Sequence, residues 1–258
     1  MINRPVITKA TIVELEQVAP SVYSLLLETE KAFPEPHPFQ FVLIHYGSFQ
    51  LRRPFSVAGY SDNRLRLVFK VKGRMTSALS RAKAGDRLSV IGPLGSRLDY
   101  TSFERILAVA GGIGIAPFLY FFKKEAGRRN LSLIFGVKTV DDAWYEDIYT
   151  DLKGFLLVTE DGSSGYSGYP VDYIMAVSGY FAPEAVIAVG PEPMLRSLRA
   201  AALQLQIPFF VSLEPYMGCG LGACNSCLTR LASGEYVRAC EKGPVFELSD
   251  LMEEVESW

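Results

Sequence analysis

Short apolar and β-branched runs recur along the chain up to about residue 97, and clusters of turn residues separate them. The runs are Ile7–Glu14, Val22–Glu28, Phe39–Tyr46, Phe55–Tyr60, Leu65–Val71 and Arg87–Ile91, and the turns include Pro34–Pro38, Ser61–Asn63 and Gly92–Gly95. Short strands divided by regular turns predict a small antiparallel β-barrel. One short helix is expected within this part, from Met75 to Ala82.

The pattern changes near Asp99, where helical stretches begin to alternate with buried strands. The predicted strands are Ile106–Ala110, Leu131–Val137, Phe155–Thr159, Ala185–Val189 and Pro208–Leu213, and the predicted helices are Ile115–Ala126, Ala143–Leu152, Pro170–Val177 and Pro193–Leu205. This alternation predicts a doubly wound parallel sheet. Regular patterning stops after Glu214. We therefore expect a β-barrel over residues 1–98, an α/β domain over residues 99–213 and a C-terminal module over residues 214–258.

Length and charge agree with this multi-domain β plus α/β organisation. A chain of 258 residues suits two domains and an appended module. The net charge of −2 does not favour nucleic acid as a partner, because such binding needs a basic face. Residues 1–9 lack the apolar segment of a secretory signal. The uncharged stretch from Ile106 to Phe122 is interrupted by glycines and a proline, so we expect no membrane span and a cytoplasmic protein.

All four cysteines fall within one short stretch, spaced as Cys219-x4-Cys224-x2-Cys227-x12-Cys240. The first three match the C-x4-C-x2-C run of plant-type ferredoxins, which predicts a [2Fe–2S] cluster. Small residues surround them: Gly218, Gly220, Gly222 and Ala223. Such a loop lets backbone N–H groups point at the sulfurs of an anionic cluster. A structural zinc site is the alternative, although zinc sites usually show two C-x2-C pairs and only Cys224 and Cys227 form one here.

Two glycine turns follow predicted strands and open helices. The first contains Gly111, Gly112, Gly114 and Pro117, and the second contains Gly190, Pro191 and Met194. Glycines let a pyrophosphate approach the backbone, and a helix N-terminus favours its negative charge. The first turn has a proline in place of the usual third glycine, which the first turn of a helix accepts. The alternatives are a tight packing turn at the first position and a plain strand–helix connection at the second.

The charges near the next strand end favour NAD over NADP. No Lys or Arg occurs between Lys153 and Arg196, a span that includes the acidic loop with Asp161. An acidic residue suits a free ribose hydroxyl, whereas a 2′-phosphate needs a cation. Lys138 is the one nearby cation that leaves NADP open. We therefore predict that Asp161 contributes to an NAD site.

Taken in order, these features resemble one known family. The chain has Arg53-Pro54-Phe55-Ser56 on a barrel strand, the two glycine turns, and four cysteines followed by Glu241-Lys242-Gly243-Pro244-Val245-Phe246. This order resembles the ferredoxin–NADP reductase superfamily. Within it, almost the whole chain looks most like the electron-transfer subunit of type B dihydroorotate dehydrogenase.

The resemblance implies roles for particular residues. Arg53 would bind the FAD pyrophosphate and Ser56 would hydrogen-bond near the flavin N5, with Pro54 and Phe55 between them. The next strand would lie against the cofactor through Phe69, Lys70 and Val71. A Gly-x-x-Thr segment, formed by Gly73 and Thr76 and including Met75, would hold phosphate. Cys219, Cys224, Cys227 and Cys240 would be the cluster ligands.

The same resemblance implies a mechanism and a partner. NAD exchanges two electrons at once and a cluster only one, so FAD must stand between them. Dihydroorotate would be oxidised on a separate FMN-containing subunit, in a complex of two plus two chains. No catalytic side chain is expected in this subunit, and we expect His37 and His45 to be structural.

Two alternatives stay open. One is an NAD(P)H oxidoreductase subunit that serves ferredoxin, sulfur compounds or a hydrogenase. In the NADH-dependent ferredoxin:NADP oxidoreductases the first cluster ligand resembles an aspartate, so Cys219 argues against that group. The other is a redox sensor that uses the cluster as a switch, although a sensor does not need nicotinamide turns.

Overall fold

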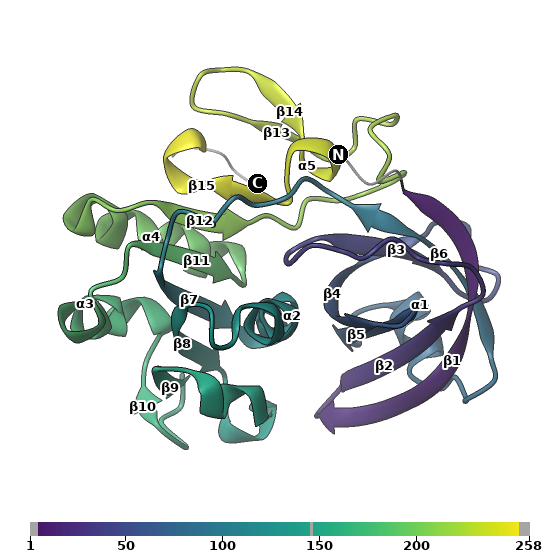
Figure 1. The fold of residues 1–258 in the computed structure, drawn as a ribbon, viewed down its shortest axis with the longest axis horizontal. Coiled ribbons are helices and arrows are strands. Elements are labelled where there is room, and N and C mark those ends of the chain that lie inside the picture. The colour runs from purple at the N-terminus through teal and green to yellow at the C-terminus, as the bar shows by residue number, and fades with distance from the viewer. Residues whose placement is uncertain (1–4, 145–146, 253–258) are drawn as a thin grey trace.

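The first six strands close into an antiparallel barrel, as the short apolar runs and regular turns predict (Figure 1). A computed structural model describes residues 5–144 and 147–252. The barrel order is β1-β2-β5-β4-β3-β6. Its elements are β1 (Val6–Ala19), β2 (Val22–Thr29), β3 (Phe41–His45), β4 (Arg53–Ser61), β5 (Arg64–Lys70) and β6 (Arg87–Leu94), with α1 (Arg74–Leu79) between β5 and β6.

Both faces of strand β3 are buried, because each packs against a different part of the protein. Val42 and Ile44 point into the barrel interior. Phe41 and Leu43 point outward into a second core, which they share with residues near the C-terminus. The barrel is therefore covered on this side, and β3 becomes the strand that connects it to the C-terminal module.

The second sheet has seven strands in the order β10-β9-β8-β7-β11-β12-β15. Six of them are parallel, and the edge strand β15 runs antiparallel to β12. The strands are β7 (Arg105–Gly111), β8 (Asn130–Val137), β9 (Gly154–Thr159), β10 (Tyr166–Ser167), β11 (Ala185–Val189), β12 (Phe209–Ser212) and β15 (Val245–Glu247); the connections contain η1 (Gly112–Ile115), α2 (Ala116–Glu125), η2 (Val140–Asp142), η3 (Asp147–Asp151), α3 (Pro170–Phe181) and α4 (Glu192–Leu205). This is the predicted doubly wound α/β domain.

The predicted helix Ala143–Leu152 is wrong. The structure has only the short 3₁₀ turn η3 in this stretch, and residues 145–146 lie outside the described part. Trp144 is buried with its ring against Phe135, at a centroid distance of 5.8 Å. Tyr149 stacks on Phe155 at 5.2 Å. These aromatic anchors on β8 and β9 fix the backbone path, and tertiary packing overrides the local helical pattern.

Helix α2 joins the sheet to the barrel and lies between them in Figure 1. Phe118 and Phe121 contact Phe39 of the barrel, with ring centroids 5.4 and 5.2 Å apart. Tyr120 reaches into the barrel core and donates a hydrogen bond to the Pro36 carbonyl at 3.1 Å. An ion pair between Lys124 and Glu35 adds a polar contact at the rim. Aromatic burial of this kind fixes how the two domains sit against each other.

The uncharged stretch from Ile106 to Phe122 divides into β7, η1 and α2, as the sequence predicts. Its apolar character reflects burial on both sides rather than contact with lipid. Within the described part of the chain, no helix has the length and apolar character needed to span a membrane.

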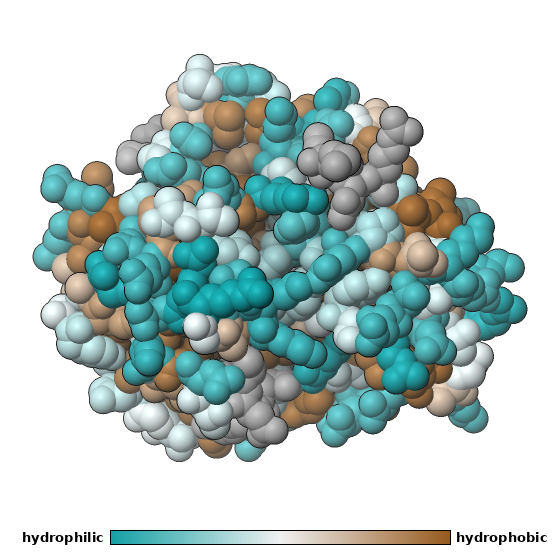
Figure 2. All heavy atoms as spheres, viewed as in Figure 1, coloured by the Kyte–Doolittle hydropathy of each residue, from teal (hydrophilic) through white to brown (hydrophobic). Residues whose placement is uncertain are grey.

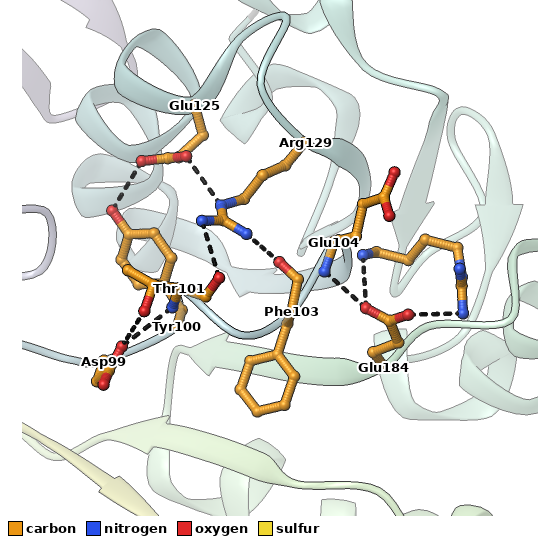
Figure 3. A network of polar contacts seen from close by, with 9 residues as sticks. Asp99, Tyr100, Thr101, Phe103, Glu104, Glu125, Arg129 and Glu184 are labelled. Atoms are coloured by element: carbon orange, nitrogen blue, oxygen red, sulfur yellow. Dashed lines mark hydrogen bonds and ion pairs between the residues drawn. The ribbon is translucent and has the colours of Figure 1, made fainter.

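A polar network fastens the connection between the domains to the end of α2 (Figure 3). Tyr100 donates a hydrogen bond to the buried carboxylate of Glu125 at 3.0 Å. Arg129 donates to the same carboxylate at 2.9 Å and also reaches the Phe103 and Thr101 carbonyls. Burial raises the pKa of the Tyr100 hydroxyl, and the charge of Glu125 adds to the effect. The network leaves Glu125 fully paired, which its burial requires.

The C-terminal module lies across both domains and appears in yellow at the top of Figure 1. It consists of the cysteine loop, β13 (Leu228–Arg230), β14 (Tyr236–Arg238), α5 (Ala239–Lys242), β15 and η4 (Leu248–Asp250). These elements lie where the sequence shows no regular pattern. Pairing of β15 with β12 makes the module part of the α/β sheet. The Ser96 N–H donates to the Gly243 carbonyl at 2.6 Å, which connects the module to the end of the barrel.

Candidate functional site

A cavity of about 730 Å³ opens where the parallel strands end, between the α/β domain and the barrel. Ligands of open α/β sheets bind at this edge. The cavity brings together both predicted glycine turns and Lys70 of the barrel. Residues that line it and were not predicted as site residues include Val22, Lys72, Gly136, Asp142, Trp144 and Glu160. Three of these, Asp142, Trp144 and Glu160, follow β8 or β9, and the rule that ligands gather at strand ends was the signal available for them.

The first turn has room for backbone alone. A Cβ on Gly114 would lie 2.1 Å from the Val189 carbonyl oxygen, and one on Gly111 would lie 2.7 Å from Pro191. Gly112 differs, because its φ is +52° and no atom lies within 4 Å of its Cβ position. The other glycines thus allow close packing, while Gly112 leaves the backbone open. This arrangement fits the approach of a pyrophosphate to the turn.

The second turn covers the first. Met194 lines the cavity and packs closely on both turns. A Cβ built on Gly111 would lie 2.8 Å from the Met194 sulfur, and one built on Gly190 would lie 2.5 Å from the Met194 methyl carbon. Pro117 is buried in the first turn of α2 and does not line the cavity. Its contribution is therefore to the helix start, and Gly111, Gly112 and Gly114 form the wall.

The acidic loop after β9 contains Glu160 and the predicted residue Asp161, which lie differently with respect to the cavity. Asp161 accepts hydrogen bonds from the Ser163 N–H at 3.0 Å and the Ser163 hydroxyl at 2.6 Å. These bonds lower the pKa of the Asp161 carboxyl, which is fully exposed. Glu160 lines the cavity, and Lys138 lines it from the end of β8. Of the acidic residues in this loop, Glu160 lines the cavity and Asp161 does not.

One ion pair crosses from the barrel to the α/β domain at the cavity. The Lys70 ammonium lies 3.3 Å from the Asp142 carboxylate. The two side chains are 37% and 22% exposed, so the pair is only partly screened by solvent. Lys70 is therefore held at the boundary between the predicted flavin strand and the predicted nucleotide cavity.

The predicted flavin residues occupy two faces of the barrel wall. Phe55 and Phe69 point inward and meet edge to face, with centroids 5.7 Å apart. Ser56 lies on the opposite face of β4 from Phe55, because successive residues of a strand alternate. Pro54 is exposed and Arg53 is half-buried. Ala58, on the same face as Ser56, is buried in the core that contains Phe118 and Phe121 of α2, so the part of the outer face that can meet a ligand is the start of β4 around Pro54 and Ser56.

The segment around α1 has an open backbone and an ordered start. The Thr76 hydroxyl accepts hydrogen bonds from the Lys72 N–H at 3.0 Å and the Gly73 N–H at 3.1 Å. No atom lies within 4 Å of a Cβ built on Gly73. Met75 is buried in the barrel core and Val71 is partly buried against it. The Thr76 hydroxyl also donates to the Gly73 carbonyl at 3.0 Å, so these polar groups are already paired with one another and the exposed backbone at Gly73 is the part that a phosphate could approach. Any contact by Met75 would come from its backbone.

The cysteine loop folds so that its N–H groups point at sulfur. The Leu221 and Ala223 N–H groups donate to the Cys219 sulfur, each at 3.3 Å. The Cys219 N–H donates to the Cys224 sulfur at 3.3 Å, and the Ser226 hydroxyl lies 3.0 Å from that sulfur. Donors around thiolates stabilise an anionic group, which fits an iron–sulfur cluster.

Two of the cysteines are exposed or half-buried, and two are buried. Cys227 and Cys240 lie in the core, and burial raises the pKa of the Cys240 thiol to about 12, with Cys227 and Cys219 adding to the shift. Hydrogen bonds from Ser226, and then from the Cys219 N–H, lower the pKa of the exposed Cys224 thiol to about 6. The cysteines come from one loop and one helix, and Cys240 of the helix lies close enough to Cys227 and Cys219 of the loop to interact with them electrostatically.

Gly220 joins the cysteine loop to the barrel. Its φ is +67°, and a Cβ there would lie 2.6 Å from Leu43 on the outer face of β3. Leu43 pairs with Pro54 across the β3–β4 ladder. The loop is thus packed one strand away from the predicted flavin residues.

Comparisons with known proteins agree with these features. A family model described as the iron–sulfur cluster binding domain of dihydroorotate dehydrogenase B matches residues 214–252. The chain is 32% identical over 248 residues to the dihydroorotate dehydrogenase B (NAD(+)) electron transfer subunit of Caldanaerobacter subterraneus subsp. tengcongensis. That alignment covers 95% of this chain and 98% of the relative.

Solved structures show the same overall arrangement. The chain is similar to the structure described as NADH-dependent reduced ferredoxin-NADP oxidoreductase, with a TM-score of 0.85 and 31% identity over 94% of this chain and 89% of that chain. It is also similar to the ferredoxin reductase in carbazole 1,9a-dioxygenase, with a TM-score of 0.71 and 22% identity over 81% and 68% of the two chains. The second likeness shows the fold alone, and together they confirm the predicted fold class.

Proposed function

Because the chain belongs to the family of dihydroorotate dehydrogenase B electron-transfer subunits, we propose that it passes electrons to NAD⁺ from a separate FMN-containing subunit that oxidises dihydroorotate. The relatives and the reductase fold support FAD, a [2Fe–2S] cluster and NAD as its cofactors. A family model for an iron–sulfur domain over the cysteines favours a cluster over the zinc alternative. The need for NAD⁺ and for reduced thiols supports a cytoplasmic location.

The observation that carries the proposal is that the barrel contacts both other sites. Val22 and Lys70 line the nucleotide cavity, and Leu43 lies against Gly220 of the cysteine loop. A flavin on the outer face of β4 would therefore lie between a nicotinamide and a cluster. When bound, FAD exchanges electron pairs with the nicotinamide and single electrons with the cluster.

The residues of this chain bind and orient the groups. Arg53 and Ser56 would hold FAD, and the turn formed by Gly73 and Thr76 would lie beside its phosphates. The Gly111–Gly114 turn would hold the NAD pyrophosphate, and Glu160 would accept a hydrogen bond from the ribose. Cys219, Cys224, Cys227 and Cys240 would hold the cluster. We propose that residues 1–98, 99–213 and 214–258 correspond to these FAD, NAD and cluster functions.

The partner would bind beside the cysteine loop. Four large apolar or aromatic side chains of the module are exposed: Tyr216 (65%), Leu221 (48%), Leu228 (44%) and Tyr236 (61%). Figure 2 shows hydrophobic side chains among polar ones over this module. Exposed apolar groups near a cluster support a protein-docking surface. A complex of two subunits of each kind is the assembly we propose.

The test is to mix the anaerobically prepared chain with the candidate FMN subunit and to follow dihydroorotate-dependent NAD⁺ reduction. We expect turnover only when both proteins are present. A Cys219→Ser variant should retain NADH oxidation with an artificial acceptor but lose turnover with the partner. Dihydroorotate oxidation by the chain alone would refute the division of labour.

The likeness to the NADH-dependent ferredoxin-NADP oxidoreductase structure, at 31% identity, favours a second candidate. In it, the chain would serve ferredoxin or another large electron-transfer subunit in place of the dihydroorotate enzyme. Cluster and FAD present by absorbance, together with no turnover with the FMN subunit, would select this candidate.

A further inference from the structure

The four cysteines lie on two separate pieces of chain, and side chains as well as backbone connect those pieces. Cys219, Cys224 and Cys227 belong to the loop, and Cys240 belongs to α5 beyond the β13–β14 hairpin. The Ala239 N–H donates to the Cys227 carbonyl at 3.0 Å, which is a backbone connection at the base. The outer part of the loop needs another one.

Arg238 supplies that connection. Its Nε donates to the Asn225 side-chain carbonyl at 2.7 Å, and its Nη1 lies 3.1 Å from the Glu241 carboxylate. Asn225 directly follows Cys224 and has a φ of +58°. One guanidinium therefore spans from the loop that carries three cysteines to the helix that carries the fourth. The planar group with its fixed donors suits such a two-sided contact better than an ammonium does.

Glu241 extends the same connection into the loop. A Cβ built on Gly222 would lie 2.3 Å from the Glu241 carboxyl group, so the carboxylate packs directly on the Gly222 α-carbon. The Arg238 and Glu241 side chains are 42% and 48% exposed, which leaves both charges partly screened. A positive and a negative charge are thus fixed between the loop that carries Cys224 and the helix that carries Cys240.

We propose that Arg238 is a positioning residue for the cluster. Through its contacts with Asn225 and Glu241, Arg238 holds the two cysteine-bearing segments together and sets the reduction potential of the bound cluster. The proposal rests on the cluster-binding function proposed above. Reduction adds one negative charge to a cluster, so a nearby cation favours the reduced form and a nearby anion opposes it. Arg238 and Glu241 therefore act in opposite directions on the potential.

The experiment compares variants of the full chain, loaded anaerobically, by iron and sulfide content, visible circular dichroism and an EPR-monitored redox titration without NAD. Arg238→Gln should lower the midpoint potential and Glu241→Gln should raise it. Arg238→Lys keeps the charge but not the two-sided contact, so it should lose the cluster to a chelator faster while its potential stays closer to that of the unaltered chain. The matched control is Arg230→Gln, because Arg230 is a cation of the same hairpin that lies over the Tyr236 ring, 5.8 Å from its centroid.

The outcomes separate the two proposals. Opposite shifts in Arg238→Gln and Glu241→Gln, with none in Arg230→Gln, would support the positioning role. Full cluster with the same midpoint in the Arg238, Glu241 and Arg230 variants would overturn it and leave the proposed function intact. If Arg238→Gln does not fold, a midpoint that is not raised in Glu241→Gln overturns it equally. An unaltered chain that takes up no iron and sulfide would overturn the proposed function itself.

Discussion

Replacing Gly220 by alanine tests whether the cysteine loop is held against the barrel. The new Cβ would lie 2.6 Å from Leu43 Cδ1 and 3.1 Å from its Cγ. Leu43 is completely buried, so it has little room to move away. Overpacking of this kind costs about 1–3 kcal/mol. The φ of +67° adds roughly 1–2 kcal/mol for a residue with a Cβ. We therefore expect Gly220→Ala to lower the free energy of unfolding by about 2–5 kcal/mol.

The assay is urea unfolding under anaerobic conditions, followed by far-UV circular dichroism and by bleaching of the cluster absorbance. Gly234→Ala is the control, because Gly234 has a φ of +87° but no atom within 4 Å of its Cβ position. This variant should lower the free energy of unfolding only by the roughly 1–2 kcal/mol that backbone strain costs. The difference between the two variants measures the contact with Leu43.

A double variant gives an independent check. Leu43→Ala alone should cost about 2–5 kcal/mol through the cavity it leaves. Combined with Gly220→Ala, it makes room for the new methyl group, so the total loss should fall short of the sum by about 1–3 kcal/mol. Strict additivity, or a Gly220→Ala variant no less stable than Gly234→Ala, would refute a loop held by Leu43.

Three further predictions concern the nucleotide cavity and the domain connection. Gly114→Ala places a Cβ 2.1 Å from the Val189 carbonyl oxygen, so it should lower the unfolding temperature and weaken NADH binding. The control Gly179→Ala in α3, where the Cβ would meet open space, should instead stabilise the chain by roughly 0.5–1 kcal/mol. Equal unfolding temperatures for the two variants would contradict this prediction. Glu160→Gln should weaken NADH binding by about 1.5–3 kcal/mol, roughly tenfold or more, and reduce the ratio of the affinity for NADH to the affinity for NADPH. Asp161→Asn should change neither the affinity nor the ratio. Titration of each variant with each nucleotide measures both quantities. Because burial raises the pKa of Tyr100 in the folded state, the unfolded chain releases that proton more readily, and stability should fall as the pH rises above about 10. Urea unfolding of Tyr100→Phe should show a smaller fall over that range, and an unchanged slope would show that Tyr100 does not contribute.

Local patterns predicted most of the fold because they report burial directly. The short apolar runs of β1 to β6 match strands that send side chains into the barrel interior, and the buried runs of β7, β8 and β11 match parallel strands covered on both sides. The pattern was misleading at residues 143–152, where Trp144 and Tyr149 are anchored by aromatic rings from other elements. Short elements such as β13, β14 and β15 leave too little sequence for a period to show.

The chemistry of the site was also partly local. The spacing of the four cysteines predicts a cluster, and the glycines before a helix predict a nucleotide site. Both predictions are possible from a few neighbouring residues, because the geometry of a loop depends mainly on its own backbone. The local sequence did not show which acidic residue between positions 159 and 163 lines the cavity. In the structure, Ser163 donates two hydrogen bonds to the Asp161 carboxylate within the loop, and Glu160 lines the cavity.

Local sequence patterns were sufficient to predict a barrel followed by an α/β sheet, the residue types for a cluster and a nucleotide, and the family that they resemble. How these elements meet follows from tertiary packing: Lys70 lies opposite Asp142, Leu43 against Gly220, and Arg238 between Asn225 and Glu241. Each of these contacts joins positions far apart in the chain or from different elements. Their distances depend on the packing of whole domains, which no local period or spacing encodes.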